Sequence, residues 1–93
     1  MREIPLTARP RLTTRARLQW DTVREKQVLL APEGVLVLNA TASAILALCN
    51  GQRSVSAIAA DLSAQYDRAV EQEVVTFLNR LIHKRLMEFD DDE

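Results

Sequence analysis

Residues 29–39 read LLAPEGVLVLN, and the Pro-Glu-Gly turn at their centre constrains the fold more than any other feature of the chain. Proline fixes φ at the second position of a tight turn, and a glycine two residues later suits a short hairpin with a bulge. The apolar residues on both sides are strand formers. The stretch therefore predicts two antiparallel strands, at residues 27–30 and 35–38.

A further strand is expected before this hairpin. Between Arg15 and Trp20 the residues alternate, which places Leu18 and Trp20 on one face of a half-buried strand and Arg15 and Arg17 on the other. The outer face of this strand is therefore basic. The three strands are expected to form an antiparallel meander, with residues 35–38 at one edge of the sheet.

After residue 38 the period of the apolar residues changes from two to three or four, which predicts three helices. Asn39 or Thr41 is expected to cap the first helix, Ser54 the second and Asp67 the third. The third, over residues 68–86, is the longest amphipathic element. The fold class is therefore predicted to be α+β and winged-helix-like, with a three-stranded antiparallel meander followed by three helices.

A chain of 93 residues builds one domain around a single core. Residues 1–12 lack apolar periodicity and are expected to form an extended arm outside that core. Residues 13–89 are expected to form the domain, in which Met87 and Phe89 extend the helix packing or form a brief strand. Residues 90–93 are expected to be an acidic tail.

The sequence carries no pattern typical of an enzyme. It contains no glycine-rich phosphate loop, no nucleophile elbow and no paired metal-ligand motif. Cys49 and His83 are the sole residues of their kinds and do not make a four-ligand zinc site, so neither a metal nor another cofactor is expected. Cys49 falls in the apolar pattern of a helix, as a buried thiol does. No apolar run approaches the roughly 20 residues that span a membrane, and a cytoplasmic protein is expected.

The predicted helix-turn-helix also suits a nucleic-acid-binding regulator of the winged-helix type. A recognition helix places its leading residues beside phosphates, and here those residues include Glu71 and Glu73, which a phosphate repels. The sequence pI of about 5.8 argues in the same direction. Arg15 and Arg17 keep the alternative open, but no aromatic stacking platform accompanies them. Nucleic acid is therefore not the expected partner.

The strand at residues 35–38 makes a peptide-binding module the favoured interpretation. An open sheet edge is a template on which an extended peptide adds as a further strand. Val35 and Val37 point to one face and Leu36 and Leu38 to the other. One pair is expected to pack on the helices. The pattern leaves open whether the second pair lies on the outer face or is also covered by the protein itself.

The chain carries five short segments in a fixed order: RPRL at 9–12, RLQWD at 17–21, VLLAPEG at 28–34, LNATA at 38–42 and GQRSV at 51–55. In their order and spacing they resemble the family of the D protein of pyrroloquinoline quinone (PQQ) biosynthesis, PqqD. The resemblance covers residues 9–89. Asn50 stands where the family often has Asp, a change that keeps the helix-ending chemistry.

The resemblance implies a peptide chaperone without catalytic activity. Such a protein binds the precursor peptide PqqA and presents it to the radical S-adenosylmethionine (SAM) enzyme PqqE, with the peptide lying along the third strand and against the third helix. A homodimer through the arm or the sheet edge is compatible with this role. The implied peptide-binding residues are Val35, Leu36, Val37, Leu38, Val74, Phe77, Leu78 and Leu81, and Arg15 and Arg17 are a speculative face for the enzyme.

Overall fold

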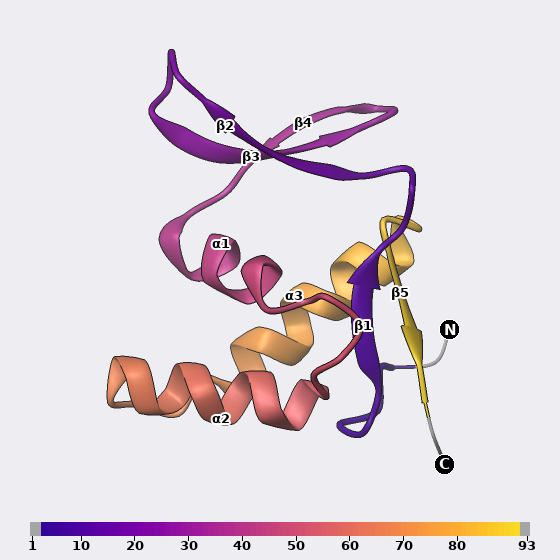
Figure 1. Ribbon diagram of the computed structural model, residues 1–93, viewed down its shortest axis with the longest axis vertical. Coiled ribbons are helices and arrows are strands. Elements are labelled where there is room, and N and C mark those ends of the chain that lie inside the picture. Colours follow the sequence, from indigo (N-terminus) through magenta and orange to yellow (C-terminus); the bar gives the residue numbers. More distant parts are fainter. Residues whose placement is uncertain (1–2, 92–93) are drawn as a thin grey trace.

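The computed structural model describes residues 3–91, which form three helices and five strands. In Figure 1 a three-stranded sheet lies at one end of the molecule, above the helices, and a two-stranded sheet runs beside them. The expected α+β class, with antiparallel sheets and three helices, is confirmed. The elements are β1 (Arg9–Leu12), β2 (Arg17–Asp21), β3 (Lys26–Ala31), β4 (Gly34–Val37), α1 (Ala40–Ala47), α2 (Val55–Tyr66), α3 (Glu71–His83) and β5 (Met87–Asp90).

The turn at Pro32 produces the hairpin that the sequence predicts. Ala31 pairs with Gly34, so Pro32 and Glu33 form a two-residue loop between β3 and β4. Gly34 takes a φ of 150°, which glycine adopts without steric cost. The strands follow one another in the order β2-β3-β4, as expected for a meander. Strand β4 is therefore at the edge of its sheet.

The register of the hairpin decides which apolar pair faces the helices. Leu29 pairs with Leu36, and both belong to or pack against the hydrophobic core. Leu38, two residues further along, is also buried. Val35 and Val37 point to the opposite face and keep 54% and 45% of their surface exposed. The sequence pattern left open whether the second apolar pair is exposed on the outer face or covered by the protein itself. The structure shows that this pair, the two valines, is exposed on the outer face.

The first two helices begin at the caps that the sequence predicts. Asn39 Oδ1 accepts a hydrogen bond from the backbone N–H of Ala42 at 2.8 Å. Ser54 Oγ accepts one from the backbone N–H of Ala57 at 3.0 Å. Both side chains satisfy a donor that the helix itself leaves without a partner. The chain is thereby directed downward from the edge strand β4 into α1, as Figure 1 shows.

The predicted start and end of the third helix are wrong. Asp67 adopts the left-handed conformation and ends α2, so it does not cap α3. Helix α3 begins at Glu71 without a side-chain cap, and Val70 before it donates its N–H to Ser63 Oγ at 3.0 Å. The helix ends at His83 because the chain turns there for β5, the brief strand expected as one of two outcomes.

For residues 3–12, the expectation of an extended arm outside the core, made for residues 1–12, is also wrong; residues 1 and 2 lie outside the described part of the chain. Arg9–Leu12 is strand β1, which pairs antiparallel with β5. Ile4 and Ala8 belong to the hydrophobic core, with 4% and 0% of their surface exposed. The carbonyl of Ala8 accepts the N–H of Val55 at 2.9 Å. The apolar residues of this segment have no regular period because the segment contacts α3, α2 and β5 one after another along its length. Apolar periodicity therefore does not reveal its burial.

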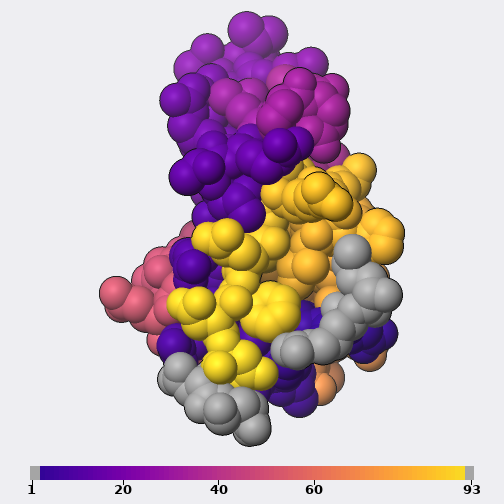
Figure 2. All heavy atoms as spheres, turned by 90° about the vertical axis from the view of Figure 1, so that its right-hand side faces the viewer, coloured from indigo at the N-terminus to yellow at the C-terminus, as the bar shows by residue number. Residues whose placement is uncertain are grey.

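The acidic tail expected at residues 90–93 begins inside a strand. Asp90 is the last residue of β5, and its carboxylate accepts a hydrogen bond from Arg11 at 2.7 Å. Arg11 also pairs with Glu88 at 2.9 Å. Residues 92 and 93 lie outside the described part of the chain. In Figure 2 strand β5 runs over the surface below the three-stranded sheet.

We predict that Ile4→Ala lowers the free energy of unfolding by about 2–4 kcal/mol, because it removes a buried side chain and leaves a cavity. Leu6→Ala is the matched control. Leu6 is 42% exposed, so its substitution is expected to cost less than about 1 kcal/mol. Urea unfolding followed by circular dichroism measures both variants. Equal costs would contradict the placement of Ile4 in the core.

Candidate functional site

A cavity of about 390 Å³ opens where the end of β4, the start of α1 and the exposed side of α3 meet. We call it the β4–α3 groove. Its floor is apolar, and its rim carries the polar and charged side chains. The lining residues are Leu36, Val37, Leu38, Asn39, Thr41, Ala42, Ile45, Gln72, Glu73, Thr76, Phe77 and Arg80.

Strand β4 brings free backbone groups to one side of this groove. The N–H of Leu38 bonds to the carbonyl of Gln27 on β3 at 3.0 Å. Because pairing alternates along an antiparallel ladder, Leu36 also directs its backbone groups toward β3. The backbone N–H and C=O groups of Val35 and Val37 consequently point to the free edge of the sheet. These groups can pair with a strand from outside the chain.

Helix α3 turns one face to the core and a neighbouring face to the groove. Val74, Leu78 and Leu81 are spaced four and three residues apart and are fully buried. The expectation that these three residues line a binding groove is therefore wrong: they serve the core. Phe77 is half-buried and lines the groove, as expected.

Sequence reasoning missed two sets of groove residues: those that α1 and its cap contribute, Asn39, Thr41, Ala42 and Ile45, and the polar residues of α3. Gln72, Glu73, Thr76 and Arg80 lie at the spacing of one helix face, next to the stripe of core positions. The sequence does place them on one face, because residues three and four apart along a helix share a side. A search for apolar residues at helical spacing does not identify them, since it selects only the residues that face the core.

The charges at the rim of the groove differ in their pairing. Glu73 accepts a hydrogen bond from the Arg68 guanidinium at 2.5 Å, and this bond lowers the pKa of the Glu73 carboxyl. Glu73 therefore stays ionised at neutral pH, with its charge compensated. Arg80 is exposed, and its side chain has no acidic partner within the described residues 3–91. The groove thus carries one uncompensated positive charge.

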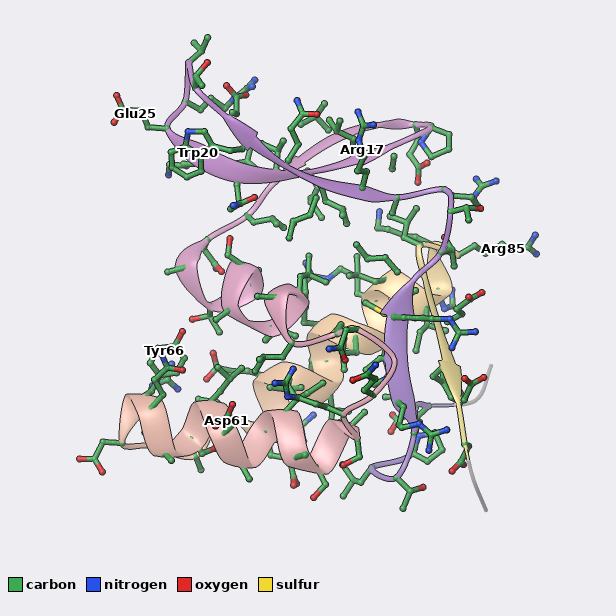
Figure 3. All side chains as sticks on the ribbon, viewed as in Figure 1. Arg17, Trp20, Glu25, Asp61, Tyr66 and Arg85 are labelled. Carbon is green, nitrogen blue, oxygen red and sulfur yellow. The ribbon has the colours of Figure 1, made fainter. Side chains whose placement is uncertain are left out.

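Arg15 and Arg17 do not line the groove. Arg17 lies on β2 in Figure 3, at the opposite end of that strand from Trp20, and donates a hydrogen bond to Gln19 Oε1 at 3.4 Å. Arg15 precedes β2 and is exposed. Because β2 and β4 flank β3 on opposite sides, these arginines remain accessible when the β4 edge is occupied.

Other kinds of site find little support in the described residues. No cluster of histidine, cysteine and acidic side chains able to hold a metal ion occurs between residues 3 and 91. Within the same range, no helix is long and apolar enough to cross a membrane. Cys49 is buried, its Sγ donates to the carbonyl of Ile45 at 3.2 Å, and burial raises its pKa to about 12. A thiol in this state is not a nucleophile at neutral pH.

We predict that iodoacetamide does not label Cys49 in the folded protein at pH 7.5, because the thiol is both buried and protonated. Labelling in 8 M urea, followed by intact-mass spectrometry, is the positive control. The rate in the folded protein is expected to be lower by at least about a hundredfold. Comparable rates in the two conditions would contradict the burial of this side chain.

Comparisons with known proteins give one family. Residues 26–87 match the family described as coenzyme PQQ synthesis protein D (PqqD). A relative from Stutzerimonas stutzeri named PqqA binding protein is 40% identical over 86 residues, which are 90% of this chain and 94% of the relative.

Two solved structures resemble the fold. One is the NMR structure of the PqqD truncation of Methylobacterium extorquens PqqCD, described as a stand-alone recognition element for ribosomally synthesised and post-translationally modified peptides. Its TM-score is 0.71 at 41% identity, over 85% of this chain and 87% of that one. The other is the crystal structure of PqqD from Xanthomonas campestris, with a TM-score of 0.55 at 36% identity, over 81% of this chain and 87% of that one.

Proposed function

This chain belongs to the PqqD family, and on that premise we propose that it is a non-catalytic peptide-binding protein of PQQ biosynthesis that takes the precursor peptide PqqA as an added strand along β4. The relative named PqqA binding protein supports the choice of peptide. The free backbone groups of Val35 and Val37, next to a groove with an apolar floor, are the observation that carries the mode of binding.

Strand addition divides the recognition between two sources. Backbone hydrogen bonds to Val35 and Val37 give affinity without regard to the peptide's side chains. Side chains of the peptide that fall beside Leu36 point into the groove and meet Phe77 of α3. Such a peptide covers the apolar surface of the groove, while the two ends of the peptide extend beyond the protein. A small protein can thus hold a peptide and leave the peptide residues that an enzyme modifies accessible.

We further propose that the bound peptide is presented to the radical SAM enzyme PqqE. The solved relative is the PqqD truncation of a PqqCD protein, so in that organism the PqqD domain forms part of a longer protein. Arg15 and Arg17 lie away from the β4 edge and are candidates for contact with the enzyme. A cytoplasmic location and a homodimer through the N-terminal segment or the sheet edge remain predictions.

We predict that Val37→Pro weakens PqqA binding by at least about tenfold, because proline removes the edge donor and places its ring where the added strand must lie. Val37→Thr keeps the amide and the branched shape and is the matched control, with affinity close to that of the parent. Isothermal titration calorimetry measures binding, and circular dichroism checks the fold.

A variant that does not fold would be replaced by Val35→Pro, which blocks the other outward-pointing position. Full affinity in a folded proline variant would rule out strand addition at β4. Tight, steeply salt-dependent binding to duplex DNA, with no affinity for PqqA, would instead favour the nucleic-acid-binding alternative.

A further inference from the structure

We propose that the β4–α3 groove selects a peptide segment with an acidic side chain directed into the groove, and that Arg80 is the specificity-determining residue that binds this carboxylate. The inference rests on the proposed strand addition and goes beyond it, because backbone pairing alone does not distinguish one peptide sequence from another. It assigns a role to a side chain that is exposed and that forms no ion pair with any other of the described residues 3–91.

Strand geometry limits which peptide residues meet α3. Residues directly opposite each other on adjacent strands share a face of the sheet. Peptide residues opposite Leu36 and Leu38 therefore point into the groove, and those opposite Val35 and Val37 lie over the outer face. Side-chain selection by α3 thus acts on every second residue of the added strand. The intervening residues meet the two exposed valines instead.

The charge that a groove-facing residue meets is positive. Two of the lining residues are charged, Glu73 and Arg80. Glu73 is already bound by Arg68, which leaves little attraction for a basic residue of the peptide. Arg80 has no such partner among residues 3–91. An incoming carboxylate therefore finds a donor whose charge is available.

The neutral polar groups on the rim are largely engaged. Asn39 Oδ1 accepts the capping hydrogen bond of α1, and Gln72 Nε2 donates to Thr76 Oγ1 at 3.1 Å. The floor beside Arg80 is apolar, with contributions from Leu36 and Phe77. A peptide that covers this floor excludes water from the neighbourhood of the guanidinium, and an ion pair formed there is stronger than one in open solvent.

The position of Arg80 also indicates where along the groove the acid lies. Lys84 follows one turn later, just beyond α3, whereas Glu71 and Glu73 occupy the first turn of the helix. The potential along the helix thus changes from acidic to basic toward its C-terminal end. In Figure 1 that end of α3 and the Gly34 end of β4 lie on the same side of the molecule. We expect the acidic residue near this end.

A double-mutant cycle tests the inference. PqqA is titrated into the parent protein, Arg80→Gln and Arg80→Lys by isothermal titration calorimetry, and each Asp or Glu of the peptide is replaced in turn by its amide. Arg53→Gln, which removes an exposed charge that does not line the groove, is the matched control. Arg80→Gln is expected to weaken binding about two- to fivefold, with Arg80→Lys and Arg53→Gln close to the parent.

For one acidic residue of the peptide, replacement by its amide is expected to weaken binding to the parent protein by a similar factor. The same replacement is expected to leave the affinity for the Arg80→Gln variant unchanged. Unchanged affinity of Arg80→Gln, or strictly additive losses for every peptide position, would overturn the inference. Val37→Pro separates this failure from that of the proposed function. If Val37→Pro still loses binding, strand addition stands and Arg80 alone is wrongly assigned; if it binds normally, the docking mode itself is wrong.

Discussion

The pairing of β3 with β4 is the interaction on which the rest of the structure depends. It aligns Leu36 with Leu29, and this register sends the leucines of β4 to the core side and its valines outward. Because side chains alternate along a strand, a shift of one residue would exchange the two sets. The same register fixes which backbone groups face the open edge. The two-residue loop at Pro32 thus determines both the packing and the binding surface.

A second constraint positions the other wall of the groove. Strand β1 pairs with β5, which directly follows α3, and Arg11 joins the two strands through Glu88 and Asp90. The carbonyl of Pro10 also accepts the N–H of Gly51 at 2.9 Å, before α2 begins. The segment that precedes the meander is therefore bound to the helical layer. Because it continues into β2, it also links that layer to the three-stranded sheet.

Local patterns predicted local structure well in this chain. The turn at Pro32 and the caps at Asn39 and Ser54 were predictable because each depends on residues within four positions of one another. The burial of Ile4 was not, because it depends on distant partners such as Asn79, whose side-chain oxygen accepts its N–H at 2.8 Å. Phe77 was identified among the groove residues, but the polar rim was missed because apolar spacing marks the core face of α3. The winged-helix comparison stays a prediction.

The central claim, that a peptide adds to the free edge of β4, is tested most directly by amide hydrogen exchange with and without PqqA. The account predicts slower exchange at the N–H groups of Val35 and Val37 when the peptide is bound, because they become hydrogen-bonded. Leu18 and Trp20, whose N–H groups face the other edge of the same sheet, are expected to exchange at unchanged rates. Protection at Leu18 and Trp20 instead, with none at Val35 and Val37, would contradict it.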